Sequence, residues 1–267
     1  MPSQDSNTPL HVVQITDTHL GASAGDALVG LDTDYSLDCV LDLIRREQLR
    51  MDVLLVTGDI SNCGDTNAYR RVEDKTAPFC SRRHWLPGNH DLPERMRQVA
   101  PARMDGAVEY GNWLILLLDS SVRNEVGGAL ADSELARLEQ VLAGAGDRHV
   151  LVCLHHHPIA SGCEWLDTQQ VSNSDAFFAV IDRFPQVRAV LWGHIHQETD
   201  RYRGNVRLLS TPSTCIQFAP DSKGFRLDRR NPGYRWLQLY ADGRIETAVS
   251  RVQGVYFGID YEQTGGY

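Results

Sequence analysis

Polar side chains that can bind metal ions follow five apolar segments of the sequence. The motifs are QIT-DTH, LLVT-GD, WLP-GNHD, CLHHHP and LW-GHIH. Their candidate ligands are Asp17, His19, Asp59, Asn89, His194, His196 and one member of the run His155-His156-His157. This mixture of oxygen and nitrogen ligands suits manganese, iron or zinc better than monovalent copper, and it is too rich in nitrogen for calcium or magnesium. The sequence therefore indicates a metal site assembled from remote motifs.

The number of candidate ligands is too large for one tetrahedral ion. Two ions that share a carboxylate fit better, because a carboxylate has two oxygens that can face two metals about 3.5–4 Å apart. Asp59 is the natural bridge. Two divalent ions would keep a net positive charge after two aspartates and a hydroxide are counted, and a neutral amide at Asn89 preserves that charge. Phosphate esters are therefore the expected substrates.

The elements that must position these motifs are short strands that alternate with helices. Strands are expected at residues 11–16, 53–57, 84–86, 150–154 and 188–192, which are rich in branched apolar residues. Helical periodicity is clearest at 34–46 and 133–143, with Asp132 as the expected N-cap of the second helix and Gly144 just past its end. This alternation predicts an α/β fold with helices over the sheet faces. Such sheets bind ligands at the carboxyl ends of their strands, which is where the motifs lie.

The C-terminal third of the chain has a different pattern. Between residues 198 and 252 the helical period is lost, and 206–209, 236–240 and 245–249 read as strands joined by turns. A second, more antiparallel sheet is expected there. No linker divides residues 1–253, which we interpret as a single domain, and 254–267 are expected to form a loosely ordered tail.

Composition excludes several classes of function. The net charge of -9 argues against a nucleic acid polymer as partner. No segment has the length and apolar character of a membrane span, and the N-terminus does not resemble a secretory signal. The six scattered cysteines are expected to be reduced. We therefore expect a cytoplasmic enzyme that is a monomer or a homodimer and does not associate with membranes.

The ordered series DTH, GD, GNHD, HHP and GHIH resembles the calcineurin-like metallophosphoesterases. The sequence in and around the motifs more narrowly resembles the bacterial class III 3′,5′-cyclic AMP phosphodiesterases, in segments that include ITDTHL, WLPGNHD, LHHHPIASGCEWLD and TPSTCIQF. This resemblance covers nearly the whole chain apart from its ends. It implies a four-layer α/β/β/α sandwich of two mixed sheets flanked by helices, with a dinuclear metal centre that most often holds iron or manganese and can hold zinc.

The resemblance also implies how the ligands are shared. One ion would be held by Asp17, His19, Asp59 and His196, and the other by Asp59, Asn89, His156 and His194. His156 is selected because the family's ligand in the fourth motif lies two residues before a proline, here Pro158. His155 and His157 would then pack beside the site, and either could contact substrate.

The expected reaction is hydrolysis of 3′,5′-cyclic AMP to 5′-AMP by in-line attack of a metal-bridging hydroxide. His90 would protonate the leaving O3′, and Asp91 would orient His90 by accepting its other N–H. The residues expected to contact substrate are His19, Asp59, Asn89, His90, His196 and, as a further candidate, His157.

Two other functions remain open at this stage. The same centre could act on another phosphodiester or on a pyrophosphate-linked nucleotide, because the ligand set does not select the substrate. The fold could also serve as a non-catalytic scaffold, but such a protein should have lost ligands. Outside the motifs, His11, His84 and His149 are interpreted as ordinary histidines, and the pairs Arg82-Arg83 and Arg229-Arg230 as solvated surface charges.

Overall fold

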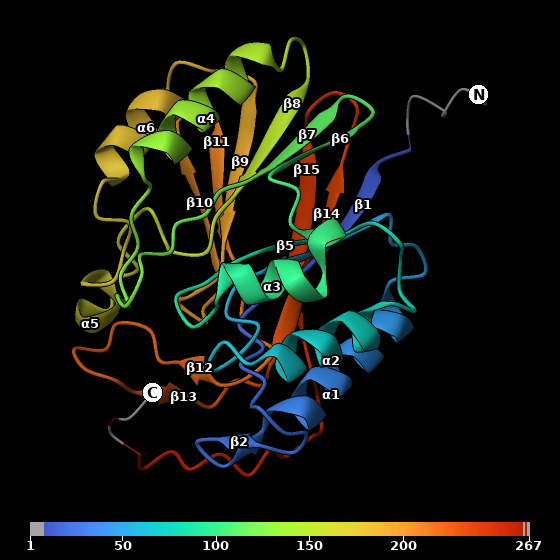
Figure 1. Ribbon diagram of the computed structural model, residues 1–267, viewed down its shortest axis with the longest axis vertical. Helices are drawn as coiled ribbons and strands as arrows, with labels where there is room; N and C mark the ends of the chain where they lie inside the picture. Colours follow the sequence, from blue (N-terminus) through green and yellow to red (C-terminus); the bar gives the residue numbers. More distant parts are fainter. Residues whose placement is uncertain (1–7, 264, 266–267) are drawn as a thin grey trace.

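Two β-sheets pack face to face and helices cover their outer faces in the computed structural model, which describes residues 8–263 and 265 (Figure 1). Helices α4 and α6 lie beside β8 and β9, while α1 and α2 lie on the opposite side of the molecule. The expected four-layer sandwich is confirmed. In the described part of the chain, no helix is long and apolar enough to cross a membrane.

The first sheet has the strand order β15-β14-β1-β4-β5. Its parallel strands are β1 (Leu10–Ile15), β4 (Val53–Thr57) and β5 (Arg83–Leu86). Two antiparallel strands, β14 (Gly233–Leu239) and β15 (Ile245–Arg251), extend it beyond β1. This sheet is therefore mixed.

The second sheet is also mixed and has the order β10-β11-β9-β8-β7-β6. Its strands are β10 (Thr199–Arg203), β11 (Val206–Ser210), β9 (Val187–Trp192), β8 (His149–Cys153), β7 (Trp113–Leu117) and β6 (Ala107–Tyr110). The four central strands run parallel, and each edge strand pairs antiparallel with its neighbour.

The expectation that the C-terminal third forms its own antiparallel sheet is wrong. Strand β11 joins β9 in the second sheet in parallel, whereas β14 and β15 join the first sheet. Strand propensity and turn residues identify the strands, but pairing partners are set by tertiary packing.

The helices are α1 (Thr33–Glu47), α2 (Thr66–Thr76), α3 (Pro93–Val99), η1 (Pro101–Arg103), α4 (Asp132–Gly144), α5 (Glu164–Asp167) and α6 (Ser174–Ile181). Both helices expected from periodicity are present. The expected N-cap of α4 is wrong by one residue, because Ala131 is the N-cap and Asp132 is the first helical residue. The charge of Asp132 there still interacts favourably with the helix dipole. Gly144, expected just past the end of the helix, is its last residue.

The core has two parts that correspond to the two faces of each sheet. Between the sheets lies an apolar layer made of side chains such as Val12, Leu55, Leu117, Leu151 and Leu191. Side chains on the outer faces pack under the helices, as do Leu37, Val40, Leu41 and Ile44 on the buried stripe of α1. Because strands such as β4 and β7 are buried on both faces, they read in the sequence as continuous apolar runs.

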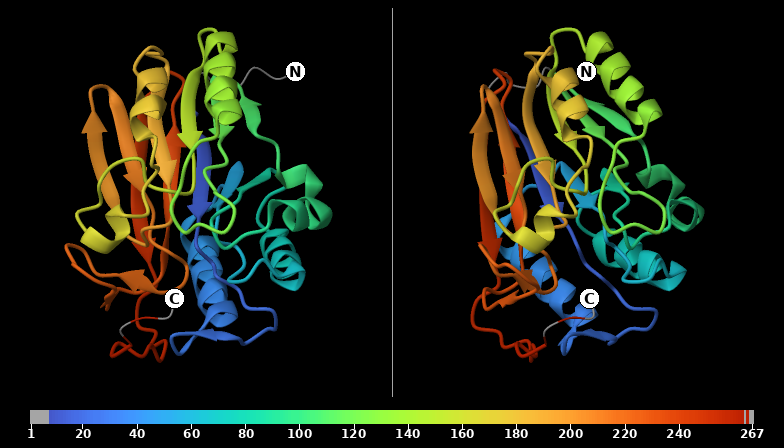
Figure 2. Two further views of the ribbon diagram at one scale, coloured as in Figure 1. Left: turned by 60° about the vertical axis from the view of Figure 1, so that its left-hand side comes forward. Right: turned by 90° about the vertical axis from the view of Figure 1, so that its left-hand side faces the viewer.

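The described part of the expected tail packs against the protein. It lies at the same end of the molecule as β2 (Ala27–Leu28), which pairs with β3 (Leu31–Asp32) (Figures 1 and 2). Phe257 and Ile259 are buried, and the Asp260 N–H donates to the Val29 carbonyl at 2.9 Å. The positions 264, 266 and 267 of the expected tail lie outside the described residues. The domain boundary at residue 253 stays a prediction.

Candidate metal centre

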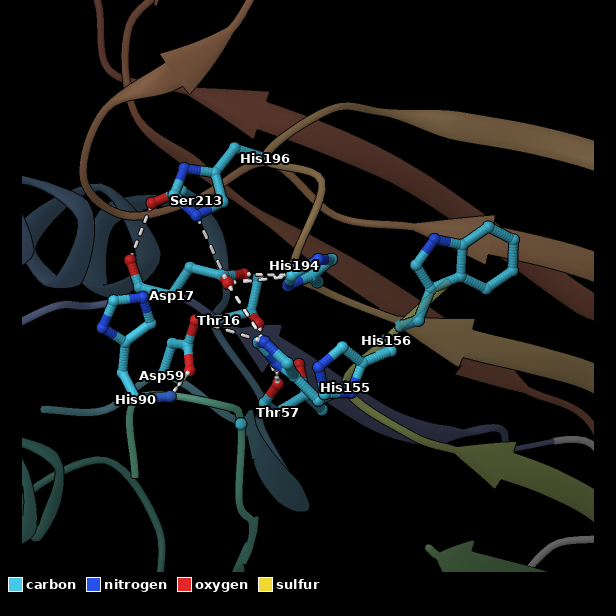
Figure 3. A network of polar contacts seen from close by, with 12 residues as sticks. Thr16, Asp17, Thr57, Asp59, His90, His155, His156, His194, His196 and Ser213 are labelled. Atoms are coloured by element: carbon cyan, nitrogen blue, oxygen red, sulfur yellow. Dashed lines mark hydrogen bonds and ion pairs between the residues drawn. The ribbon is translucent and has the colours of Figure 1, made fainter. Parts of the chain in front are cut away.

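The five motifs meet at the carboxyl ends of parallel strands, as expected, and these strands belong to both sheets. Strands β1, β4 and β5 of the first sheet precede Asp17 and His19, Asp59, and Asn89 and His90. Strands β8 and β9 of the second sheet precede the three-histidine run and the His194-x-His196 pair. Figure 3 shows part of this group close together, with labels at Asp17, Asp59, His90, His155, His156, His194 and His196.

The backbone at five candidate ligands adopts the left-handed conformation. Positive φ angles occur at Asp17 (53°), His19 (46°), Asp59 (49°), His194 (62°) and His196 (49°). The i, i+2 spacing of Asp17-x-His19 and His194-x-His196 would place both side chains on one side of an extended segment, but neither pair has an extended backbone. Such a conformation costs about 1–2 kcal/mol per non-glycine residue and persists where surrounding contacts enforce it. Here the Asp17 N–H donates to the Gly58 carbonyl at 3.0 Å and the His19 N–H to the Asp59 carbonyl at 2.9 Å.

Two glycines of the motifs permit close approaches that a side chain would block. A Cβ on Gly58, whose φ is 93°, would lie 2.4 Å from the Nδ1 of His155. A Cβ on Gly193 would lie 2.1 Å from the Oγ1 of Thr16. The glycines of GD and GHIH therefore bring the loops of one sheet against those of the other.

The first ligand cluster contains Asp17, His19 and His196, with Asp59 at its edge. The Nε2 of His196 lies 3.3 Å from the Nε2 of His19 and 3.3 Å from an Asp17 oxygen. The Nε2 of His19 lies 3.7 Å from the Oδ2 of Asp59. The Ile216 carbonyl holds the Nδ1 of His196 at 2.8 Å, which leaves Nε2 for the cluster. These atoms could all contact one ion.

The second ligand cluster lies on the other side of Asp59. Three buried atoms have no hydrogen-bond partner within the described residues: Asn89 Oδ1, His155 Nε2 and His194 Nε2. The Nε2 of His155 forms an ion pair with the Asp59 Oδ2 at 3.2 Å, and its Nδ1 lies 2.8 Å from the Thr57 carbonyl. Buried polar atoms are seldom left without a hydrogen-bond partner, so their clustering here indicates a site for a cation.

His156 contacts protein groups through both ring nitrogens. Its Nδ1 lies 2.8 Å from the Ser120 Oγ and its Nε2 lies 3.1 Å from the Val126 carbonyl. It nevertheless offers a ligand atom within 4.8 Å of those of His155 and His194, and its ring centroid lies 4.7 Å from that of His194. His156 as the ligand therefore stays a prediction, with His155 as the neighbouring candidate.

The charges of the site require a cation as well. Asp17 and Asp59 are buried, and a buried carboxylate is costly without a positive partner. Burial lowers the pKa of His19 and of His194 well below the usual range, so both rings are neutral and able to bind a metal. Although burial opposes it, the Asp59 carboxylate raises the pKa of His155 to about 9, so this ring holds a proton that a metal ion would have to displace. The two buried carboxylates and the neutral imidazoles therefore fit a pair of cations.

His90 lies beside the first cluster and is half-buried. Its backbone N–H donates to the Asp59 Oδ1 at 2.9 Å, and its ring meets the His19 ring edge-on with centroids 5.0 Å apart. The Nδ1 of His90 lies 2.9 Å from the Asn62 carbonyl. The expectation that Asp91 orients this ring is wrong, because a backbone carbonyl takes that position.

Asp91 instead ties two ligand loops together. Its carboxylate accepts the N–H groups of Ile60 at 3.2 Å, Ser61 at 3.0 Å and Gly88 at 3.0 Å. Burial and the nearby Asp59 carboxylate raise the pKa of Asp91 to about 6. A carboxylate in this position fixes the segment after Asp59 against the segment before Asn89.

His157 is buried next to the second cluster. Its ring stacks on His194 with centroids 5.6 Å apart, and its Nε2 lies 3.6 Å from the Asp167 Oδ1. Burial lowers the pKa of His157 to about 4. Its contact with substrate stays a prediction.

The remaining histidines and arginines singled out in the sequence lie in other contacts. His84 lies 2.5 Å from the Tyr110 hydroxyl, and His149 packs against Trp113. The interpretation of Arg83 as a solvated charge is wrong, because Arg83 is buried and pairs with Glu73 at 2.6 Å. Arg230 is exposed and pairs with Asp228 at 2.5 Å. These pairings give the basic residues structural partners.

Partners of the ligands were missed from the sequence. Oxygen atoms of Thr57, Ser120 and Ile216 contact imidazoles of the site. The Phe218 ring stacks on the His196 ring, with centroids 4.2 Å apart and an interplanar angle of 12°. The similarity of the segment 211–218 to the family marked the region without assigning a role. Carbonyl groups carry no sequence signal, because every residue has one.

Comparison with known proteins gives a consistent result. Residues 10–198 match the family model described as calcineurin-like phosphoesterase. A Pseudomonas aeruginosa protein named 3′,5′-cyclic adenosine monophosphate phosphodiesterase CpdA is 46% identical over 99% of this chain and 100% of its own length. The Escherichia coli protein of that name is 41% identical over 96% of this chain and 94% of its own.

Solved structures share the fold at lower identity. A dimetal phosphatase from Danio rerio superposes with a TM-score of 0.59 at 16% identity, over 92% of this chain and 100% of that one. A purple acid phosphatase from yellow lupin superposes with a TM-score of 0.66 at 11% identity, over 96% of this chain and 54% of that one. With the family match and the relatives, these findings show that the chain belongs to the calcineurin-like phosphoesterases.

Proposed function

We propose that this chain hydrolyses 3′,5′-cyclic AMP to 5′-AMP at a dinuclear metal centre. The observation that carries the proposal is two groups of buried candidate ligands, Asp17, His19 and His196 on one side of Asp59 and His155, His156 and His194 on the other. The substrate follows from the two relatives described above, each of which matches nearly the whole chain and is named a cyclic AMP phosphodiesterase.

The two ions would be held by ligands shared between the sheet ends. One set is Asp17, His19, Asp59 and His196, and the other is Asp59, Asn89, His155 and His194. When bound, such ions lower the pKa of water and neutralise charge on phosphoryl oxygens. At one position the proposed set takes His155, which faces Asp59, and the His156 predicted from the sequence stays the alternative.

The leaving O3′ would be protonated by a side chain of the protein. A water oxygen forms a bond to phosphorus while the bond from phosphorus to O3′ breaks, and the departing oxygen needs a proton. His90 is the half-buried imidazole next to Asn89, and because the Asn62 carbonyl engages its Nδ1, its Nε2 is the atom that would deliver that proton. The Asp59 contact to the His90 backbone N–H holds the residue beside the centre.

Metal analysis together with a substrate panel tests this proposal. We expect purified protein reconstituted with Mn²⁺ or Fe²⁺ to bind two equivalents and to hydrolyse 3′,5′-cyclic AMP faster than 2′,3′-cyclic AMP, a glycerophosphodiester or a dinucleotide pyrophosphate. Faster turnover of one of the other substrates would overturn the substrate assignment and keep the chemistry. Two bound ions without any diesterase activity would favour a scaffold, and an inability to bind metal would contradict the centre itself.

Iron or manganese as the natural metal, with zinc as the alternative, stays a prediction from the ligand chemistry. The cytoplasmic location and the monomeric or homodimeric state also stay predictions.

A further inference from the structure

The proposed centre can form only if the two sheets are held in register. Ligands from the first sheet and from the second must face the same ions, and functional groups of this kind work within about 0.5 Å of their ideal positions. The layer between the sheets is apolar over much of its area, and apolar contacts are not directional. At its metal end, however, this layer contains the fully buried Gln14 of β1.

The Gln14 amide contacts the ends of three other strands. Its Nε2 donates to the Thr57 Oγ1 at 2.7 Å and to the Trp192 carbonyl at 3.3 Å, and its Oε1 accepts from the Thr211 hydroxyl. A carbonyl can only accept, so the amide nitrogen must face Trp192 and the amide orientation is fixed. Gln14 thus joins β4 of its own sheet to β9 and the segment after β11 in the other sheet.

Two of the partners of Gln14 lie two residues before a proposed ligand. Thr57 is followed by Gly58 and Asp59, and its carbonyl lies 2.8 Å from the Nδ1 of His155. Trp192 is followed by Gly193 and His194. A displacement of Gln14 would therefore reach Asp59 and His194 through the two intervening peptide bonds in each case, and His155 through a hydrogen bond.

We propose that Gln14 is a positioning residue that sets the spacing between the two ligand-bearing sheet ends, so that the second ion is bound by groups from both sheets. The proposal rests on the metal centre of the proposed function. An apolar side chain of the same length would fill this space, but it would not fix the spacing, since it makes no directional contact. Arg235 also crosses between the sheets, donating to the Ser210 carbonyl at 2.8 Å, but no proposed ligand directly follows Ser210.

The test is the substitution Gln14→Met, with Leu191→Met as the matched control. Leu191 lies in the same inter-sheet layer, next to Trp192, and makes its contacts there as an apolar side chain. We expect calorimetric titration of the metal-free proteins with Mn²⁺ to show two equivalents for the wild type and the control, with affinities within about twofold of each other. In Gln14→Met, the affinity for the weaker-bound equivalent should fall about tenfold, as is typical for partners of metal ligands. Far-UV circular dichroism of the metal-free protein should be unchanged.

Equal affinities in Gln14→Met and wild type would overturn the proposal. If Gln14→Met does not fold, Thr211→Val decides, because it removes one hydroxyl contact to Gln14 and keeps the side-chain shape. We expect Mn²⁺ affinity to fall about threefold, which is less than is typical for groups that contact the metal ligands themselves. Unchanged Mn²⁺ affinity would again overturn the proposal. A wild-type protein that binds no Mn²⁺ would contradict the proposed function, and this inference would fall with it.

Discussion

The two sheet ends contribute different chemistry to the proposed centre. The first sheet supplies the oxygen ligands Asp17, Asp59 and Asn89 together with His19, whereas the second sheet supplies imidazoles. Two imidazoles of the second sheet, at His155 and His196, are held through their Nδ1 atoms by carbonyls. Both carboxylates, including the proposed bridge, therefore come from one sheet, and the other sheet contributes imidazoles.

Because the proposed dinuclear site is divided between two sheets, substitutions in the two sheets should have different effects on metal binding. Loss of the bridging carboxylate from the first sheet should affect both ions, while loss of one imidazole from the second sheet should affect one ion. The following variants test that contrast.

The largest effect is expected for Asp59→Asn. An amide keeps the shape but cannot bridge two cations with two anionic oxygens, so both equivalents of metal should be lost and activity with them. Metal content by mass spectrometry of the folded protein and cyclic AMP turnover would measure this. A variant that retains two ions and wild-type turnover would show that Asp59 does not bridge.

The pair His155→Ala and His156→Ala compares neighbouring residues of the second sheet. His155→Ala should lower the affinity for one equivalent of metal by more than about 100-fold. Substitution of groups that only hydrogen-bond to a metal ligand already lowers metal affinity by about 10–100-fold. His156→Ala should leave both equivalents bound, while thermal stability falls because its contacts to Ser120 and Val126 are lost. The reverse outcome would restore His156 as the ligand. Calorimetric titration and thermal melting distinguish the two.

His90→Ala tests a first-sheet residue that is not a ligand. We expect kcat to fall about 100-fold with both ions bound, because proton donation to the leaving oxygen is lost. The loss should be smaller for a 4-nitrophenyl diester, whose leaving group needs no proton. Equal losses on both substrates, or loss of metal, would remove His90 from the acid role.

The smallest effect is expected for Phe218→Leu. The Phe218 ring stacks on His196, so a smaller side chain should loosen that imidazole and weaken one equivalent of metal by about tenfold or less. Phe225→Leu, which alters a neighbouring aromatic ring, serves as the control and should leave metal affinity unchanged. Matching losses in both variants would indicate a general packing effect.

Much of the site could be predicted from the sequence, because ligand types and their positions after apolar strands are local properties. Asp17, His19, Asp59, Asn89, His194 and His196 were all identified in this way, and the structure brings them together. The choice within the three-histidine run could not be made locally, since adjacent residues share one strand end. It depends on which ring faces Asp59 across the gap between the sheets.

The sequence by itself determined the α/β class, the main strands and helices, and the chemistry of the ligands, because periodicity and residue type act over short distances along the chain. The tertiary structure alone decided that β14 and β15 join the first sheet, that Asp91 ties two loops together, and that Gln14 joins the sheet ends. Each of these depends on contacts between residues far apart in sequence, whose partners are backbone groups or side chains with no distinctive local pattern.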